Sequence, residues 1–261
     1  TMSQPLAQAE TSRVYRERRS NQRITPDRRE HRRFGEEDAA PEQLQTALEQ
    51  DQPVATPEGN REKAYRVLKR GFDIVGAIAL VVALSPVLIT TYIVLLITTR
   101  GKPLFIQHGI GYLGKKFQMI KFRTMRLDAD KLQAQVQNQH NDGPIFKNRQ
   151  DPRITRIGRW LRKTSIDEMP QLFNVLAGHM SLVGPRPPVA KEVVQYKVWH
   201  RRRLAIKPGL TCLWQVSGRS EIGFEDWVRM DIWYARNQNF FTDLWLLVKT
   251  PWTVITGRGA Y

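Results

Sequence analysis

Two adjacent carboxylates, Asp167 and Glu168, are the strongest candidates for chemistry in this chain of 261 residues. They lie within RKTSIDEMPQLFNVLAGHMSLVGPRPP, residues 162–188, among basic side chains and just ahead of an apolar helical pattern. Carboxylate oxygens bind hard divalent cations, and a carboxylate can attack a phosphoryl group whose charge such a cation neutralises. The pattern therefore indicates phosphoryl transfer.

A purely structural interpretation of the same residues stays open. Ser165 and Glu168 match the spacing of a capping box, in which Glu168 would only bond back to the start of a helix. Pro170 instead favours a helix over 170–177 that begins at the proline and stops at Gly178. In that case the two acids lie just outside the helix N-terminus, where the helix dipole stabilises anions, a bound phosphate included.

The charge of the chain is uneven. Its net charge is +16, yet residues 1–60 hold 9 Arg against 11 acids, whereas residues 61–261 hold 32 basic against 14 acidic residues. Such an excess attracts nucleic acid, an anionic membrane surface or phosphorylated substrates. The single cysteine, Cys212, excludes an internal disulfide, and the five histidines show no zinc-site spacing.

One element ahead of the carboxylates predicts membrane attachment. Residues 71–99 are almost wholly apolar, and as a single helix they would reach about 43 Å, which is enough to cross a bilayer. Ser85 and Pro86 interrupt the middle, and basic residues flank both ends, which favours a re-entrant helical hairpin with both ends cytoplasmic. A transmembrane helix is the alternative, and a soluble core helix is the weakest, because no polar face interrupts the run.

The predicted organisation has three parts: a mostly disordered charged tail over 1–60 with a short helix at 41–50, a re-entrant membrane hairpin over 61–103, and a cytoplasmic catalytic domain over 104–261. The fold class expected is α/β, mainly α, monotopic, with short strands and interfacial amphipathic helices. We predict a strand at 116–125 and helices at 127–139, 189–204 and 224–237. The aromatic residues of 224–237 and of the segment 240–255 indicate membrane-interface helices or, alternatively, ordinary core packing.

The glycines at 109, 111 and 114 fit a dinucleotide-binding pattern by letter only. That motif needs a strand before it and a helix after it, whereas the alternating residues that follow predict a strand. We interpret these glycines as a turn that exposes Lys115 and Lys116.

Several motifs together resemble the bacterial sugar transferase family, the monotopic polyprenyl-phosphate phosphoglycosyl transferases. The resemblance rests on the Ser85-Pro86 break and on KFRTM at 121–125, DPRITRIG at 151–158, TSIDEMPQLFNVL at 164–176, SLVGPRP at 181–187, KPGLT at 207–211, LWQVSGR at 213–219 and the terminal GAY. It covers about residues 62–261. Because the leading 60 residues are polar, we expect a short form of the family or the catalytic end of a longer chain.

The resemblance implies a reaction in two steps. Asp167 attacks the β-phosphate of a UDP-sugar, releases UMP and forms a covalent phosphosugar, which undecaprenyl phosphate then displaces. Glu168 assists by a hydrogen bond or by proton removal, and Mg²⁺ binds at Asp167 and the substrate pyrophosphate. The sequence of the motif at 213–219 resembles that of members which transfer glucose or galactose phosphate. In those members the transfer is the first membrane step of exopolysaccharide or capsule synthesis.

The resemblance also implies supporting residues and partners. Basic residues in the matching motifs are candidates for binding substrate phosphates, namely Lys121, Arg123, Arg162, Arg186 and Arg219. Asp231 matches a recurrent family acid and is expected to support the site, although an exposed helix acid paired to an arginine would look the same. The expected partners are UDP-hexose, undecaprenyl phosphate and lipids of the bacterial plasma membrane at its cytoplasmic face, with a homodimer as one assembly.

Two other functions compete with this interpretation. A membrane-tethered nucleic-acid binder would use Arg201, Arg202 and Arg203, but it leaves the acid pair unexplained, so no nucleic-acid partner is expected. A non-catalytic membrane scaffold of polysaccharide assembly would share the architecture and differ only in whether Asp167 is chemically used.

Overall fold

The computed structural model describes residues 60–139, 142–146, 148, 150–219 and 222–256. The chain divides into two units, Thr1–Glu36 and Glu37–Tyr261, and every described residue belongs to the second. The predicted charged tail, with its predicted helix at 41–50, lies outside the described residues apart from Asn60.

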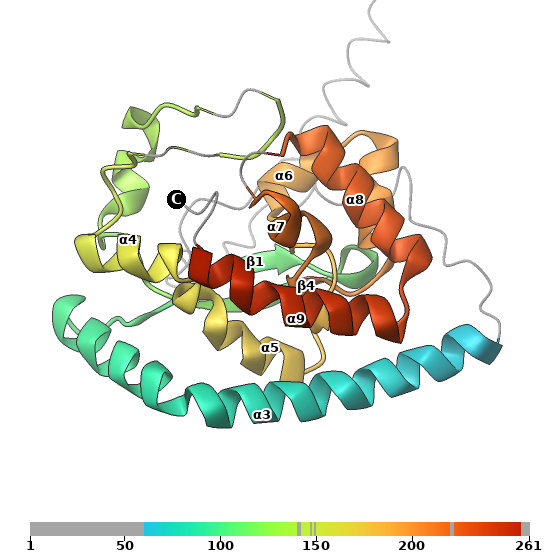
Figure 1. Ribbon diagram of the computed structural model, residues 1–261. Helices are drawn as coiled ribbons and strands as arrows, with labels where there is room; N and C mark the ends of the chain where they lie inside the picture. Colours follow the sequence, from blue (N-terminus) through green and yellow to red (C-terminus); the bar gives the residue numbers. More distant parts are fainter. Residues whose placement is uncertain (1–59, 140–141, 147, 149, 220–221, 257–261) are drawn as a thin grey trace, which may run out of the picture. The chain divides into compact units, whose positions relative to one another are not determined.

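The second unit is mainly helical with two small sheets, as predicted (Figure 1). In chain order its elements are α3 (Asn60–Thr98), β1 (Leu104–Ile110), η1 (Tyr112–Gly114), β2 (Lys116–Phe122), η2 (Ala129–Gln135), α4 (Arg156–Lys163), η3 (Ile166–Gln171), α5 (Leu172–Leu176), β3 (Ser181–Val183), α6 (Ala190–Val194), η4 (Val198–Ala205), β4 (Gly209–Thr211), α7 (Leu213–Ser217), α8 (Phe224–Asn237) and α9 (Phe240–Thr256).

The two sheets have two strands each. Strands β1 and β2 are antiparallel, with Leu104 opposite Phe122 and Ile110 opposite Lys116, while β3 and β4 are parallel. The glycine run at 109–114 turns the chain from β1 into β2, with positive φ at Leu113 (52°) and Gly114 (77°). The turn interpretation is therefore confirmed: a strand follows this run, whereas a dinucleotide motif needs a helix.

Helix α3 is one continuous helix of 39 residues that passes through Pro86. The predicted break into two arms at Ser85 and Pro86 is therefore absent, and Figure 1 shows a single bowed helix in its place. Proline removes the N–H that would bond to the carbonyl of Val82, but the Ser85 hydroxyl donates to that carbonyl at 2.8 Å. The local hydroxyl replaces the missing donor, so the helix bends without ending.

Helix α3 is long and apolar enough to cross a membrane by length and composition, and only 11% of its most apolar window is buried within the protein. Val82 is 68% exposed and Ile97 is 75% exposed. A core helix of a soluble protein would bury such side chains, because each contributes about 1.5–3 kcal/mol when removed from water. Within the described part of the chain, α3 is therefore not a core helix.

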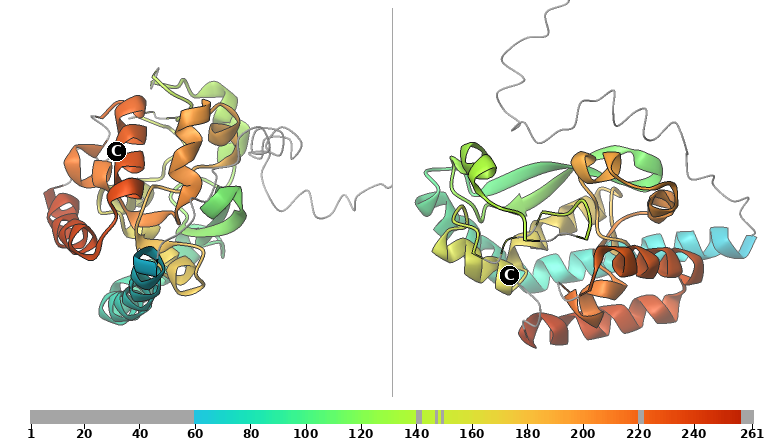
Figure 2. Two further views of the ribbon diagram at one scale, coloured as in Figure 1. Left: turned by 90° about the vertical axis from the view of Figure 1, so that its right-hand side faces the viewer. Right: turned by 90° about the horizontal axis from the view of Figure 1, so that it is seen from above.

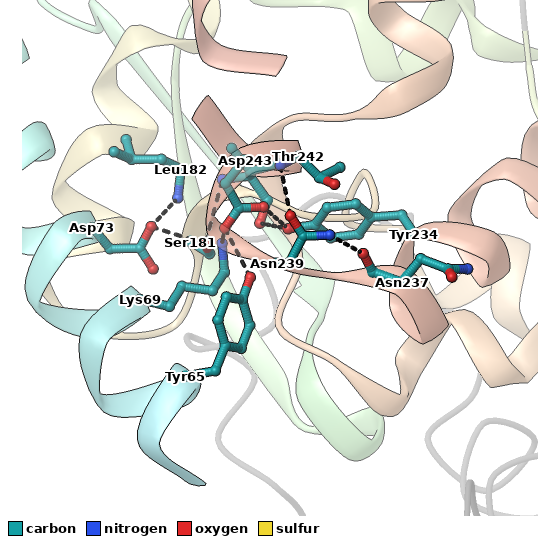
Figure 3. Close-up of polar contacts among 11 residues, drawn as sticks. Tyr65, Lys69, Asp73, Ser181, Leu182, Tyr234, Asn237, Asn239, Thr242 and Asp243 are labelled. Atoms are coloured by element: carbon teal, nitrogen blue, oxygen red, sulfur yellow. Dashed lines mark hydrogen bonds and ion pairs between the residues drawn. The ribbon is translucent and has the colours of Figure 1, made fainter. Parts of the chain in front are cut away.

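The start of α3 is held by Asp243 of α9, which is 2% exposed (Figure 3). Lys69 Nζ lies 2.6 Å from its carboxylate, and the Tyr65 hydroxyl donates to the same oxygen at 2.9 Å. The Tyr234 hydroxyl of α8 donates to the other oxygen at 2.5 Å. One buried carboxylate thus joins α3, α8 and α9, and its charge is offset by a lysine and two hydroxyl donors.

A second set of contacts joins α3 to the elements that follow the acid pair. The buried Asp73 accepts hydrogen bonds from the Ser181 hydroxyl and the Leu182 N–H, both at 2.9 Å. Arg70 donates to the carbonyl of Val175 in the last turn of α5 at 2.6 Å. Figures 1 and 2 show α5 lying against α3, which is the arrangement that these bonds require.

Several predicted helices need correction. The segment 127–139 forms only the 3₁₀ turns of η2, and the predicted helix at 189–204 is two pieces, α6 and η4. The bounds predicted for α8 are confirmed, and α9 runs on through Pro251. Trp227 and Tyr234 are buried in α8, as the core-packing alternative predicted, whereas Phe241 of α9 is 80% exposed and Trp252 is 69% exposed.

Candidate active site

Asp167 and Glu168 lie in the first turn of η3, which runs directly into α5. The predicted start of this helix at Pro170 is wrong, because Pro170 is the fifth residue of η3 and the acids lie inside its first turn. The missing N–H of Pro170 costs α5 no hydrogen bond, because Pro170 precedes the first residue of that helix. Ser165, which precedes the turn with a φ of 55°, makes no side-chain capping bond, so the capping box is not formed.

Glu168 instead pairs with Lys121 near the end of β2, with Oε1 and Nζ 3.2 Å apart. An asparagine of α5 fixes the register of the two elements: Asn174 Nδ2 donates to the carbonyl of Gln118 at 2.6 Å, and Asn174 Oδ1 accepts from the Ile120 N–H at 3.1 Å. The amide therefore satisfies the free backbone edge of β2 as a neighbouring strand would. This contact brings Lys121 to the acid pair from 47 residues away in the sequence.

Arg162 reaches the same pair from α4. Its Nε donates to the Thr124 hydroxyl at 3.0 Å, and its charge acts on Asp167 and Glu168. Thr155 caps the start of α4, and its hydroxyl accepts from the Gly158 N–H at 2.9 Å. The missing Cβ of Gly158 lets α4 approach the segment that follows β2, since a Cβ there would lie 1.9 Å from the Thr124 carbonyl oxygen.

Two further cations face Glu168 from the C-terminal half of the chain. Arg186 lines a narrow recess together with Lys121 and Glu168, and its charge acts on the Glu168 carboxylate. Arg219, whose φ of 52° is unusual for a residue with a side chain, also interacts electrostatically with Glu168. Four of the five predicted phosphate-binding residues are thus brought to the acid pair.

The fifth, Arg123, takes a different place. Its guanidinium donates to the carbonyls of Lys102 at 2.9 Å and Leu104 at 3.1 Å, and the acid that acts on it is Asp130. It lies 5.6 Å from the centre of the Phe105 ring. Arg123 therefore connects the end of β2 to the segment between α3 and β1. The structure does not show it facing the acid pair.

The two carboxylates differ in their electrostatics. Burial, then repulsion from Glu168, raises the pKa of Asp167 to about 6, against the opposing effect of Lys121 and Arg162. Burial also acts to raise the pKa of Glu168, but Lys121, Arg186 and Arg162 outweigh it, so that pKa is lowered. Glu168 thus stays ionised, and Asp167 is the more basic of the two carboxylates.

Asp231 is buried and does not line the recess beside Glu168. It is 1% exposed and forms an ion pair with Arg203 at 2.5 Å. Arg203 in turn donates to the backbone carbonyl of Arg186 at 3.0 Å and to the Tyr196 hydroxyl at 2.7 Å. The alternative of an exposed surface pair is excluded, and Asp231 acts through Arg203 on the segment that carries Arg186.

The sequence reasoning missed Gln171, which also lines the recess beside Glu168. Its side chain is 2% exposed, and its Nε2 has no hydrogen-bond partner among the described residues. The available signal was its spacing of three and four residues from the acids, which places it on their side of a helix.

The described residues contain no cluster of three or more Asp, Glu, His or Cys side chains that could hold a metal ion. The acid pair therefore offers at most two carboxylates to a cation. Two carboxylates suit Mg²⁺, which keeps several water ligands and takes others from substrate phosphates.

Comparison with known proteins assigns the chain to a family. A sequence model described as bacterial sugar transferase matches residues 64–257. The chain is 40% identical over 206 residues to a UDP-galactose-lipid carrier transferase of Erwinia amylovora, an alignment covering 75% of this chain and 42% of that protein. It is 42% identical over 209 residues to an undecaprenyl-phosphate galactose phosphotransferase of Salmonella typhimurium, covering 77% of this chain and 43% of that protein.

A shorter relative matches over most of its own length. The exopolysaccharide production protein ExoY of Sinorhizobium fredii is 36% identical over 203 residues, which cover 75% of this chain and 88% of that protein. The matched region thus spans less than half of the first two relatives and nearly nine tenths of the third.

We expect Gly158→Ala to destabilise the protein by about 1–3 kcal/mol or more, because the added methyl group collides with the backbone of Thr124. Alanine normally stabilises a helix relative to glycine by about 1 kcal/mol, so the stability change expected for Gly158→Ala has the opposite sign to the usual one. Gly71→Ala in α3, where nothing lies within 4 Å, is the matched control and should be neutral or stabilising. Thermal unfolding in detergent measures both; equal melting temperatures would contradict the close approach.

Asp231→Ala should lower the free energy of unfolding by about 3–5 kcal/mol, because it leaves the buried Arg203 guanidinium without its carboxylate. Asp226→Ala, on the exposed face of the same helix, breaks only an exposed pair with Arg229 and should cost less than about 1 kcal/mol. Chemical denaturation of both variants gives the comparison. Similar losses of unfolding free energy in the two variants would show that the buried ion pair stabilises the protein no more than the exposed one.

Proposed function

The chain belongs to the bacterial sugar transferase family, and from that premise we propose that it transfers a hexose-1-phosphate from a UDP-sugar to undecaprenyl phosphate and releases UMP. The observation that carries the proposal is the acid pair surrounded by Lys121, Arg162, Arg186 and Arg219. Donor and acceptor both carry phosphate, and several fixed cations offset that charge. The relatives named for UDP-galactose and galactose support galactose as the hexose, and an undecaprenyl-phosphate glucose phosphotransferase of Komagataeibacter xylinus, 36% identical over 204 residues, supports glucose.

In the first step the Asp167 carboxylate attacks the β-phosphorus of the UDP-sugar. A bond forms between its oxygen and that phosphorus, the bond from the phosphorus to the bridging oxygen breaks, and UMP leaves with the electron pair. The raised pKa of Asp167 supports this role, because a more basic carboxylate is a better nucleophile and one with a pKa of about 6 is still mostly ionised at pH 7.

In the second step a phosphate oxygen of undecaprenyl phosphate attacks the same phosphorus, and the Asp167 carboxylate leaves. Glu168, kept ionised by its cations, can accept a hydrogen bond from an acceptor phosphate that arrives protonated. Arg186 and Arg219 would hold phosphate oxygens on the side of Glu168. Asp167 and Glu168 would hold Mg²⁺, which when bound supplies neutralising charge to the pyrophosphate.

We also propose that both ends of α3 lie on the cytoplasmic face of the bacterial plasma membrane. The start of the helix contacts Asp243, and near its other end Leu95 packs in one cluster with Phe122 and Leu161. Both ends thus contact one folded unit, and a bilayer of about 30 Å cannot separate them without disrupting it. Basic residues at both flanks support the same placement.

Asp167→Asn should reduce UMP release by at least about 10³-fold, because the amide removes the nucleophile while keeping its shape. The assay supplies a panel of UDP-sugars with Mg²⁺ and undecaprenyl phosphate, and the donor that releases UMP names the sugar. Asp128→Asn, an exposed acid paired with Arg126, is the matched control and should keep full activity. Near-normal release by Asp167→Asn would defeat the nucleophile assignment, and no release by the wild type with any donor would favour a scaffold.

The placement of α3 can be tested with Lys63→Cys and Lys102→Cys, two exposed positions that flank the apolar run. A membrane-impermeant maleimide should label both in inside-out vesicles and neither in intact spheroplasts. Cys212 is buried and should contribute little background. Labelling of the two positions from opposite sides would establish a transmembrane helix in place of the same-side arrangement.

A further inference from the structure

A groove of about 650 Å³ lies between η4 and the outer face of α8, separate from the acid pair. Its lining includes two tryptophans, three arginines and one acid, namely Trp199, Trp233, Arg202, Arg229, Arg236 and Glu225. The buried side of α8 carries Trp227 and Asp231, which face the core and Arg203. The groove therefore uses the side of α8 that the proposed reaction does not use.

The groove has an excess of unpaired positive charge. Glu225 is already paired with Lys197 at 2.7 Å, and Arg229 is paired with Asp226 at 3.2 Å. Arg202 and Arg236 are exposed and have no carboxylate partner within the described part of the chain. Trp233 is 50% exposed beside them. Two free guanidinium groups next to an exposed indole suit a ligand that combines carboxylates with apolar side chains.

Residues 37–58 have that composition. They contain six Asp or Glu residues and no Lys or Arg, together with apolar side chains that include Leu44 and Leu48. The segment precedes the described part of the chain, which begins with Asn60 at the start of α3. Its charge is thus complementary to the groove.

The segment also joins the described structure close to the groove. Tyr65, five residues into α3, shares the Asp243 carboxylate with Tyr234, and Tyr234 is next to Trp233 in α8. Figure 3 shows Asn237, one of the residues that line the groove, beside this network, and Asn239 donates to its carbonyl at 2.9 Å. A stretch of 22 residues can extend about 70 Å, so the connection does not prevent contact. Such tethering gives an effective concentration of order millimolar.

We propose that this groove is the docking surface of the acidic segment 37–58 of the same chain, with Arg202 and Arg236 binding its carboxylates and Trp199 and Trp233 contacting its leucines. The segment is favoured over an anionic lipid because it is tethered to the same chain and combines carboxylates with leucines, which suit the arginines and tryptophans of the groove. The proposal does not depend on the transfer reaction.

The test places the photo-crosslinker benzoylphenylalanine at Gln45 in the full chain, in membranes. We expect crosslinks to peptides containing Trp199 or Trp233. A mixture of isotopically labelled and unlabelled chains identifies bonds within one molecule. Crosslinks only to lipid, to a second copy or to another surface would overturn the proposal, as would an absence of crosslinks.

Arg202→Glu with Arg236→Glu should lower the crosslink yield about threefold or more, because two charges that attract the segment become charges that repel it. Lys115→Glu with Lys116→Glu, at the exposed hairpin turn, makes the same charge change elsewhere and should leave the yield unchanged. Adding Glu42→Arg and Glu49→Arg to the groove variant should restore part of the yield. If the groove variant fails to fold, as judged by its melting temperature, Arg202→Gln with Arg236→Gln replaces it. Equal yields in the groove variant and its control would overturn the proposal.

Discussion

The architecture depends on holding two neighbouring carboxylates, Asp167 and Glu168, ionised in a half-buried turn. Removing either charge from water is costly, and the two repel each other, so the turn is stable only where cations converge on it. Lys121 from β2, Arg162 from α4 and Arg186 beyond β3 meet this requirement from three separate elements. Those elements must therefore be packed closely, and much of the fold can be understood as the means of packing them.

Small polar contacts keep these elements in place where the strands are too short to do so. The Asn174 amide completes the edge of β2, and the absent side chain of Gly158 lets α4 touch the backbone of Thr124, just after β2. Behind Arg186, the buried pair of Asp231 and Arg203 fixes the carbonyl of the residue that faces Glu168. Each contact acts on backbone groups or buried charge, where a lost partner costs more than an exposed contact contributes.

The apolar helix α3 is part of the same packing and not an appendage to it. Lys69 and Tyr65 meet Asp243 at its start, while Leu95 packs against the β2 and α4 region near its end. A membrane that holds the outer face of α3 therefore also sets the position of the acid pair relative to the lipid surface.

The sequence alone predicted the features that depend on residues close together in the chain, because helical and strand periodicity and short motifs act over a few residues. These features are the helix at 224–237, the strand that starts at residue 116, the apolar run and the acid pair. Tertiary contacts decide which cations face the acid pair. Lys121 and Arg123 belong to one motif, yet only Lys121 is shown pairing with Glu168, 47 residues away, while Arg123 bonds to backbone carbonyls near β1. The continuity of α3 through Pro86 likewise depended on a hydroxyl bond whose geometry the residue order does not specify. Composition and spacing determine which groups are available, and only packing between distant segments decides which of them meet.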